Sequence, residues 1–307
     1  MLNEIDSALL EKIADMKPGE VKGAYNIRKD SGCADRATTE NIDIKSKTDK
    51  AGIDIIVKSG TKKEVCHIPV IITQTGVTEM VYNDFYIGED ADVTIIAGCG
   101  IHNCGGEESR HDGVHTFYIG KNARVTYVEK HYGEGDGTGA KVMNPQTVAY
   151  LSEGAFLKMD TAQIKGIDST KRETKIVCGA GAEVVVTERL QTHGDQRAES
   201  NMEIVLDGTD SRGQVISRSV AQDTSEQIFY PRMTGNNRCF GHVQCDSIIM
   251  DSAKISSIPA IVANSTEAQL IHEAAIGKIA GDQLLKLQTL GLTPEEAEDR
   301  ILKGFLA

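Results

Sequence analysis

The sequence predicts a mainly β protein: a right-handed parallel β-helix with a short N-terminal helix and a small C-terminal helical domain. From about residue 40 to about residue 280, short runs rich in Val, Ile and Thr alternate with turns, and no helical period appears. A weak internal repeat with a period near 30 residues lies inside this stretch, and such a period is typical of solenoids. We therefore expect a helical segment over 1–40, a β-helix core over 41–265, and a C-terminal segment over 266–307 that holds the last strand and two helices.

The N-terminal residues predict one amphipathic helix. Ile5, Leu9, Ile13 and Met16 recur at helical spacing, and the Pro-Gly pair at 18–19 ends the pattern. We expect this helix to dock on the β-helix through its apolar face.

The repeat is clearest where Tyr86-Ile-Gly-Glu-Asp-Ala is compared with Tyr118-Ile-Gly-Lys-Asn-Ala. A small residue recurs at spacings of 32, 32 and 27, at Ala91, Ala123, Ala155 and Ala182. We expect these alanines at the bends of successive coils, where side-chain space is short. A β-sandwich is the alternative, because it would use Asp-Gly hairpin turns between strands, and that dipeptide occurs three times.

The C-terminal tail predicts two short helices. The first covers Asp282 to Leu290 and ends at Gly291. Thr293-Pro-Glu-Glu is a capping box with proline at the first helical position, and the second helix runs from there to Gly304. A small helical pair of this kind is a docking surface for another protein.

The composition excludes several classes of partner. The net charge of -12 repels a phosphate backbone, and 5% aromatic residues without Trp cannot form base-stacking platforms, so we expect no nucleic acid partner. The longest apolar runs are too short to span a bilayer, and the acidic N-terminus does not resemble a signal peptide. We expect a cytoplasmic protein whose seven cysteines are reduced, which favours metal or sulfur chemistry over disulfides.

The first candidate site combines Cys245, His272 and Glu273. Cys245 precedes His272 by 27 residues, close to one solenoid period, and neighbouring strands lie about 4.8 Å apart, so we expect the two residues to be close in space. Thiolate, imidazole and carboxylate together can hold a metal or a sulfur species. His272 and Glu273 are adjacent on an extended segment, so only one of them shares a side with Cys245. The alternative is that Cys245 is a buried core cysteine.

The second candidate metal site comprises Cys99, His102, Cys104 and His131. Cysteine and histidine are dense here, but their spacing matches no standard zinc pattern. The alternative is a polar, Gly-rich rung whose histidines satisfy turn backbone. The neighbouring glycine-rich run at 133–139 lacks the Lys-Ser/Thr ending of a P-loop, so it predicts a mobile loop and not a phosphate site.

Five short motifs lie in the C-terminal part of the chain. They are Cys245-Asp-Ser, His272-Glu-Ala-Ala-Ile-Gly-Lys-Ile, Asp282-Gln-Leu-Leu, Gly291-Leu-Thr-Pro-Glu-Glu-Ala and Gly304-Phe-Leu. Together they resemble the SufB/SufD family, the scaffold subunits of iron–sulfur cluster assembly. The broader resemblance runs from about residue 80 to the end, and the Cys99–His131 region looks like that of short archaeal and anaerobe-type members.

The resemblance implies a parallel β-helix, a homodimer, and a SufC-type ABC ATPase that docks on the C-terminal helices. It implies that Cys245 is a ligand and sulfur acceptor for a transient iron–sulfur cluster, with Glu273 and His272 beside it, and that the cluster passes to recipient apoproteins. Long SufB members carry another cysteine in a Pro-Ser-Cys segment, whereas this chain has Pro145-Gln-Thr there. Free sulfide, Cys99 or Cys104 would then replace that cysteine in sulfur supply.

We expect a scaffold protein and not an enzyme. No nucleotide-binding motif is present, so ATP hydrolysis would belong to the partner. One alternative is a β-helix carbohydrate-active enzyme, which the low aromatic content and the lack of Trp argue against. The other is a structural ATPase adaptor without cluster ligands of its own.

Overall fold

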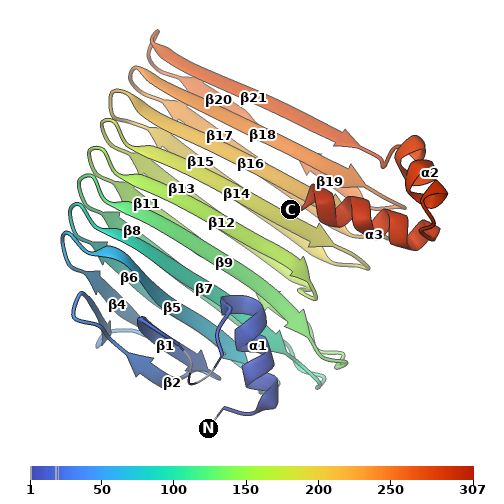
Figure 1. The fold of residues 1–307 in the computed structure, drawn as a ribbon, viewed down its shortest axis with the longest axis horizontal. Coiled ribbons are helices and arrows are strands. Elements are labelled where there is room, and N and C mark those ends of the chain that lie inside the picture. Colours follow the sequence, from blue (N-terminus) through green and yellow to red (C-terminus); the bar gives the residue numbers. More distant parts are fainter. Residues whose placement is uncertain (1, 18, 20) are drawn as a thin grey trace.

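The computed structural model describes residues 2–17, 19 and 21–307 and forms a β-solenoid of about eight turns (Figure 1). Each turn adds one strand to each of two sheets, and the strands pair in parallel with the turn before and the turn after. This confirms the predicted parallel β-helix and rules out the β-sandwich, because antiparallel pairing is confined to the N-terminal strands.

The first sheet, called sheet A, has ten strands in this spatial order. They are β2 (Gly32–Ala37), β1 (Ala24–Lys29), β5 (Lys62–Ile72), β7 (Asp92–His102), β9 (Arg124–Glu134), β12 (Phe156–Lys165), β14 (Glu183–Thr192), β16 (Ser211–Ala221), β18 (Cys239–Ile249) and β21 (Ala268–Gly277).

The second sheet, called sheet B, has eleven strands. Along its main path they are β19 (Lys254–Ser257), β17 (Glu226–Gly235), β15 (Arg197–Leu206), β13 (Ser169–Cys178), β10 (Lys141–Met143), β8 (Ser109–Ile119), β6 (Thr78–Ile87), β4 (Gly52–Val57) and β3 (Ile42–Ser46). Beside this path, β11 (Gln146–Leu151) pairs with β8 and β13, and β20 (Ala260–Ala263) pairs with β17.

The lumen between the two sheets holds the main core. Strands alternate in burial, as β15 does along its whole length, because successive side chains point to opposite faces of a sheet. Equivalent inward residues therefore stack from one turn to the next, and the aromatic rings of Phe85 and Phe117 stack 4.2 Å apart. The predicted alanines lie at the turns that lead into sheet A, and all four are buried: Ala91, Ala123, Ala155 and Ala182.

Helix α1 (Glu4–Ala14) covers the outer face of sheet A at the N-terminal end of the solenoid (Figure 1). Leu9, Leu10 and Ile13 are buried against β5, β7 and β9. Ile5 was predicted to belong to this apolar face, but its side chain is exposed. Each buried aliphatic side chain of this kind contributes about 1.5–3 kcal/mol. The helix ends at Ala14, so Met16 lies beyond it and the chain leaves the helix before the Pro-Gly pair expected to end it. Pro18 itself falls outside the described residues.

Residues 24–37 are not helical, which corrects the expectation of a helical segment over 1–40. They form β1 and β2, an antiparallel hairpin whose first strand also pairs with β5. Few large apolar residues mark this hairpin, and β2 is largely exposed, so the hydrophobic pattern that identifies the other strands is weak here.

The two ends of the solenoid differ. At the N-terminal end the sheets finish in β2 and β3, which are short and carry charged side chains such as Asp35 and Lys45. At the C-terminal end sheet A finishes in β21, a ten-residue strand on which Ile271 and Ile276 are exposed. Short charged edges resist pairing with another chain, whereas a long apolar edge favours it.

The C-terminal helices α2 (Gly281–Thr289) and α3 (Pro294–Phe305) lie beside the last turns (Figure 1). Thr293 forms the predicted capping box with Glu296, and the helix continues one residue past the expected end at Gly304. Leu302 and Leu306 pack on Val220 of β16. In the described part of the chain, no helix has the length and apolar character needed to cross a membrane.

Candidate functional site

Cys245 points into the lumen from β18, one strand in from the edge of sheet A. Its side chain is at the inward phase of a strand that alternates in burial, and the residue is 4% exposed. Burial raises the pKa of this thiol to about 11. The sulfur is therefore protonated at neutral pH, and a metal would have to displace this proton in order to bind.

His272 is the residue of the edge strand β21 that approaches this sulfur. Its Nε2 lies 3.7 Å from Sγ of Cys245. The register pairs His272 with Val243, so the contact is diagonal, two residues along the inner face. Partial burial lowers the pKa of His272, and the nearby charge of His242 lowers it further, which favours the neutral imidazole that a metal requires.

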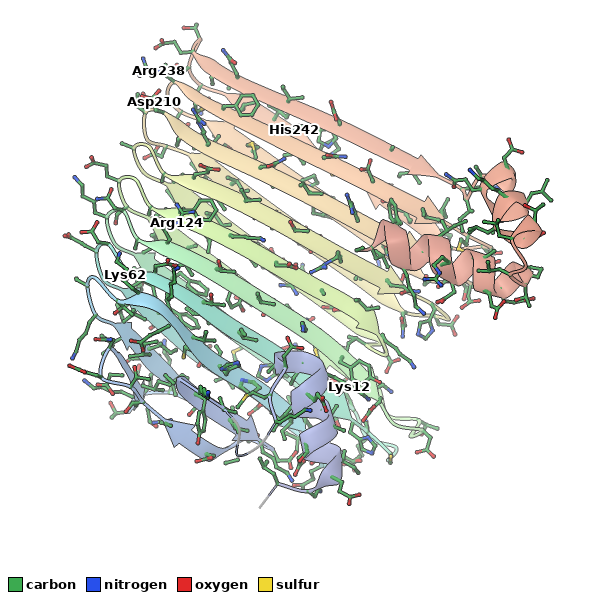
Figure 2. All side chains as sticks on the ribbon, viewed as in Figure 1. Lys12, Lys62, Arg124, Asp210, Arg238 and His242 are labelled. Atoms are coloured by element: carbon green, nitrogen blue, oxygen red, sulfur yellow. The ribbon has the colours of Figure 1, made fainter. Side chains whose placement is uncertain are left out.

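Glu273 lies on the outer face of β21, so the structure does not bring it to Cys245. Its Oε2 is 3.6 Å from Nε2 of His242, and its side chain is 65% exposed. His242 belongs to β18 (Figure 2) and was not predicted from the sequence. The last two strands thus carry one pair of potential ligands on each face. Within the described part of the chain, no group of three His, Cys, Asp or Glu side chains is placed to hold a metal.

The four residues of the second candidate site separate into two pairs. Cys99 and His131 are register partners on β7 and β9, and both are buried toward the lumen. Burial raises the pKa of Cys99 well above its usual value, and the charges of Glu79 and Glu129 act in the same direction. Burial also lowers the pKa of His131, so both groups are neutral at pH 7.

His102 and Cys104 lie outside the lumen, at the end of β7 and in the turn that follows. Cys104 Sγ is 3.1 Å from His102 Nε2, and Cys104 is exposed. The structure therefore does not form a single site from the four residues, because two face the interior and two face solvent.

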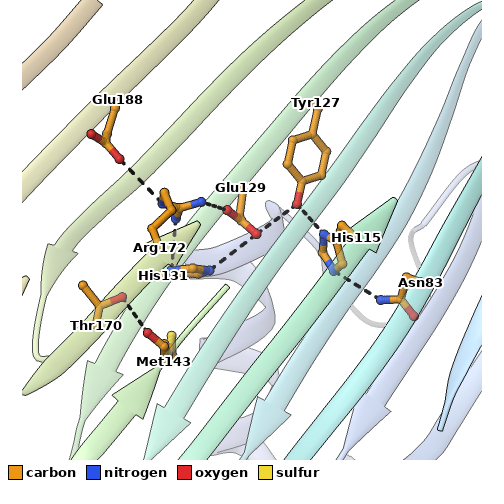
Figure 3. A network of polar contacts seen from close by, with 9 residues as sticks. All are labelled: Asn83, His115, Tyr127, Glu129, His131, Met143, Thr170, Arg172 and Glu188. Atoms are coloured by element: carbon orange, nitrogen blue, oxygen red, sulfur yellow. Dashed lines mark hydrogen bonds and ion pairs between the residues drawn. The ribbon is translucent and has the colours of Figure 1, made fainter. Parts of the chain in front are cut away.

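A buried polar network inside the lumen was not predicted (Figure 3). His115 Nδ1 lies 2.7 Å from the hydroxyl of Tyr127, which donates a hydrogen bond of 2.9 Å to Glu129. Arg172 donates to Glu129 and lies 3.6 Å from a carboxylate oxygen of Glu188. Burial opposes ionisation of Glu129, but the charge of Arg172 dominates and holds the pKa of Glu129 well below its usual value.

The network reaches the neighbourhood of Cys245. Glu188 accepts hydrogen bonds from Ser200 (2.8 Å) and Ser217 (3.4 Å), and Ser217 is the register partner of Cys245. The lumen is tightly filled, and the cavity beside Cys99 and His131 measures only about 20 Å³. The sequence holds one signal of this polar network, the pattern Val125-x-Tyr127-x-Glu129-x-His131. This alternation places polar side chains at the inward positions of a buried strand.

Comparison with known proteins identifies the chain. Residues 71–305 match the family model described as SUF system FeS cluster assembly, SufBD core domain. An iron–sulfur cluster assembly SufBD family protein of Methanocaldococcus jannaschii is 29% identical over 99% of this chain and 97% of its own length.

Other archaeal relatives are longer than this chain. SufBD family proteins of Methanothermobacter thermautotrophicus and Archaeoglobus fulgidus are 28% and 26% identical over 75% and 74% of this chain. The matched parts make up 56% and 60% of those relatives, so this chain spans little more than half of their length. The chain therefore belongs to the SufBD family of SUF-system iron–sulfur cluster assembly proteins.

Proposed function

We propose that the protein is a scaffold on which iron and sulfide combine into a transient cluster held by Cys245 and His272. The observation that carries this proposal is the 3.7 Å approach of Cys245 Sγ to His272 Nε2 at the open end of the solenoid. Thiolate binds iron–sulfur clusters strongly, and imidazole can replace thiolate as a cluster ligand. Two ligands from one chain are fewer than a stable cluster uses, which suits a cluster that must leave again.

The remaining ligands would come from a second copy of the chain. β21 is the edge strand of sheet A, carries His272, and exposes Ile271 to 45% and Ile276 to 46%. A two-fold axis at this edge would bring two identical strands together and double the number of ligands. Glu273 lies at the same edge on the outer face, so it remains a candidate ligand only for a site that two copies share.

The partner that the family resemblance implies is a SufC-type ABC ATPase on the C-terminal helices. No residue of α2 is buried, and Leu285 and Leu290 are exposed on this helix and at its C-cap. Exposed leucines on a short helix that covers no core support a docking role. ATP binding by that partner would shift the dimer between closed and open states. This chain would then be the non-enzymatic member of the assembly, in a reducing compartment such as the cytoplasm.

Anaerobic reconstitution with ferrous iron and free sulfide tests the scaffold site. We expect Cys245→Ser to lose most of the bound iron and acid-labile sulfide, and His272→Ala to lose a smaller share, because thiolate is the stronger ligand. Cys239→Ser is the matched control, since Cys239 lies on the same strand and is also buried. If Cys245→Ser bound as much cluster as the parent, the ligands would lie elsewhere and the proposed site would be wrong; a parent that bound no cluster would instead be an adaptor without ligands of its own.

A further inference from the structure

Outside the lumen, Cys104, His102 and Glu134 form a linear array at the ends of β7 and β9. His102 is the last residue of β7 and is the register partner of Glu134, the last residue of β9. Cys104 Sγ lies 3.1 Å from His102 Nε2, and His102 Nδ1 lies 3.4 Å from Glu134 Oε1. A thiol, an imidazole and a carboxylate in this order form the arrangement that activates a sulfur nucleophile.

The turn that carries Cys104 is fixed by its neighbour Asn103, which is fully buried. The Asn103 side chain accepts hydrogen bonds from the backbone N–H of Gly105 and the hydroxyl of Thr75, both at 3.0 Å. It donates to the carbonyl oxygens of Glu107 and Gly139, at 2.8 and 3.1 Å. The position of the sulfur is therefore set by a network that does not involve the sulfur itself.

The glycine-rich run at 133–139 packs against this turn, which corrects its interpretation as a mobile loop. The backbone N–H groups of Gly137 and Gly139 donate to the carbonyl oxygens of Asn103 and Gly105. A Cβ atom at Gly137 or Gly139 would lie 2.3 Å or less from a backbone oxygen of the 103–107 turn. Glycine is required here because two backbone segments approach closely.

Glu134 is held from its other side by helix α1. Lys12 Nζ lies 2.6 Å from Glu134 Oε2 and 3.1 Å from the hydroxyl of Tyr132. Partial burial acts to raise the pKa of Glu134, but hydrogen bonds from Lys12 and Tyr132 outweigh it and lower that pKa. The ionised carboxylate attracts the Nδ1–H group of His102 across 3.4 Å, without an aligned hydrogen bond in this structure. With the proton on Nδ1, Nε2 is the nitrogen free to take a proton.

Asp136 is a second charged group beside the thiol. A hydrogen bond from Cys104 lowers the pKa of Asp136, which makes this carboxylate a poor base at neutral pH. His102 is thus the group beside Cys104 suited to remove its proton.

Cys33 is the other exposed cysteine in the described part of the chain, and it faces the amide oxygen of Asn26 in place of an imidazole.

We propose that Cys104 is a nucleophilic thiol that accepts sulfane sulfur from a persulfide donor, with His102 as the base and Glu134 as the group that orients it. The assignment of the substrate class rests on the proposed function, because cluster assembly consumes sulfur. His102 takes the thiol proton, and the Cys104 thiolate attacks the terminal sulfur of R–S–S–H. The S–S bond of the donor breaks, R–S⁻ leaves and takes the proton from His102, and Cys104–S–S–H remains, with no oxidant or reductant required.

The test incubates the full-length protein with glutathione persulfide, without iron or a partner, and measures sulfur gain on each cysteine peptide by mass spectrometry. We expect Cys104 to gain one sulfur atom at least about tenfold faster than Cys33, and His102→Gln to abolish the difference. Glu134→Gln should reduce the rate of sulfur gain by Cys104 by a smaller factor and shift the pH profile of that rate, because Glu134 acts through His102. Cys33→Ser is the control that should leave Cys104 unchanged.

Equal sulfur gain by Cys33 and Cys104, or an unaltered rate in His102→Gln, would overturn the proposal. Circular dichroism of His102→Gln separates loss of the base from loss of fold. The persulfide assay contains no iron, so its outcome does not depend on metal binding by Cys245. The reconstitution assay uses free sulfide, so it does not depend on Cys104, and failure of one proposal is distinguishable from failure of the other.

Discussion

The lumen and the outer surface of this solenoid each hold a cysteine beside a histidine, and the two pairs differ in what surrounds them. Cys245 and His272 meet at 3.7 Å in the lumen, where burial keeps the thiol protonated. Cys104 and His102 meet at 3.1 Å on the surface, and a carboxylate lies beyond the imidazole. We therefore propose metal binding for the pair in the lumen and nucleophilic attack for the pair on the surface.

The largest effect should come from removing the charge that balances the lumen. Arg172→Met leaves the carboxylates of Glu129 and Glu188 without their buried partner, and we expect a loss of about 3–5 kcal/mol in the free energy of unfolding. Urea denaturation measures it. Lys12→Met is the matched control, because it breaks a surface ion pair worth about 0.2–1 kcal/mol. Equal losses in the two variants would contradict the distinction between lumen and surface.

The lumen should also make stability depend on pH. Burial lowers the pKa of His115 to about 4 from 6.5, although the charge of Glu129 opposes the shift. Between these values the unfolded chain binds a proton that the folded chain does not, so stability is full above pH 6.5 and falls as pH falls toward 4. The loss is about 3 kcal/mol, from roughly 1.36 kcal/mol per pH unit.

Urea titrations at several pH values between 4 and 7 measure this loss, and His115→Gln should flatten the dependence only in part. His131 and His67 also have a lowered pKa, in each case chiefly through burial, and they contribute in the same direction. Stability that stayed constant between pH 6.5 and 4 would show that these histidines are already charged in the folded protein.

The two thiols themselves should differ in reactivity. With a pKa of about 11, only about one in ten thousand Cys245 thiols is ionised at pH 7. We expect iodoacetamide to alkylate Cys104 at least about a hundredfold faster than Cys245 in the folded protein, as followed by peptide mass spectrometry. Unfolding in urea should bring the two rates together, and a difference that survives unfolding would point to local sequence and not to burial.

The smallest effect concerns the helix that supports the surface pair. Lys12→Met should slow alkylation of Cys104 by about twofold, because Glu134 loses a fixed partner while His102 stays in place. Lys17→Met is a suitable control, since Lys17 pairs with Glu11 on α1 and not with Glu134. If Lys12→Met lowered the alkylation rate of Cys104 as much as His102→Gln does, helix α1 would position the whole turn that carries Cys104.

The fold was predictable because each coil repeats a short pattern whose inward residues must fit the same cross-section. The recurring alanines and the 27-residue separation of Cys245 and His272 both follow from this repeat, although the true step at β18 is 29 residues, from Cys245 to Ala274. Because the offset is two residues, His272 still lies on the same face as Cys245, and Glu273 lies on the other face. The predicted contact therefore forms, at 3.7 Å, although the predicted register was wrong by two residues.

The lumen network and the division of the second candidate site were not predictable in the same way. The alternation that begins at Val125 shows that Tyr127, Glu129 and His131 share the inward face of one strand, but it does not show which residues of the other sheet they meet. Arg172 and Glu129 meet across two different sheets, 43 positions apart in the chain. The hairpin of β1 and β2 was missed because its exposed, charged residues lack the apolar alternation that identifies a strand.

The contrast between short charged strands at one end and the long apolar β21 at the other limits how copies of this molecule can associate. A stack of many copies joined end to end would need an edge strand able to pair at both ends of the solenoid. Among the described edge strands β2, β3 and β21, only β21 has the length and apolar character to pair. Association through the β21 edge would therefore close at two copies and would not propagate into a fibre, so the proposed shared site would also protect against polymerisation.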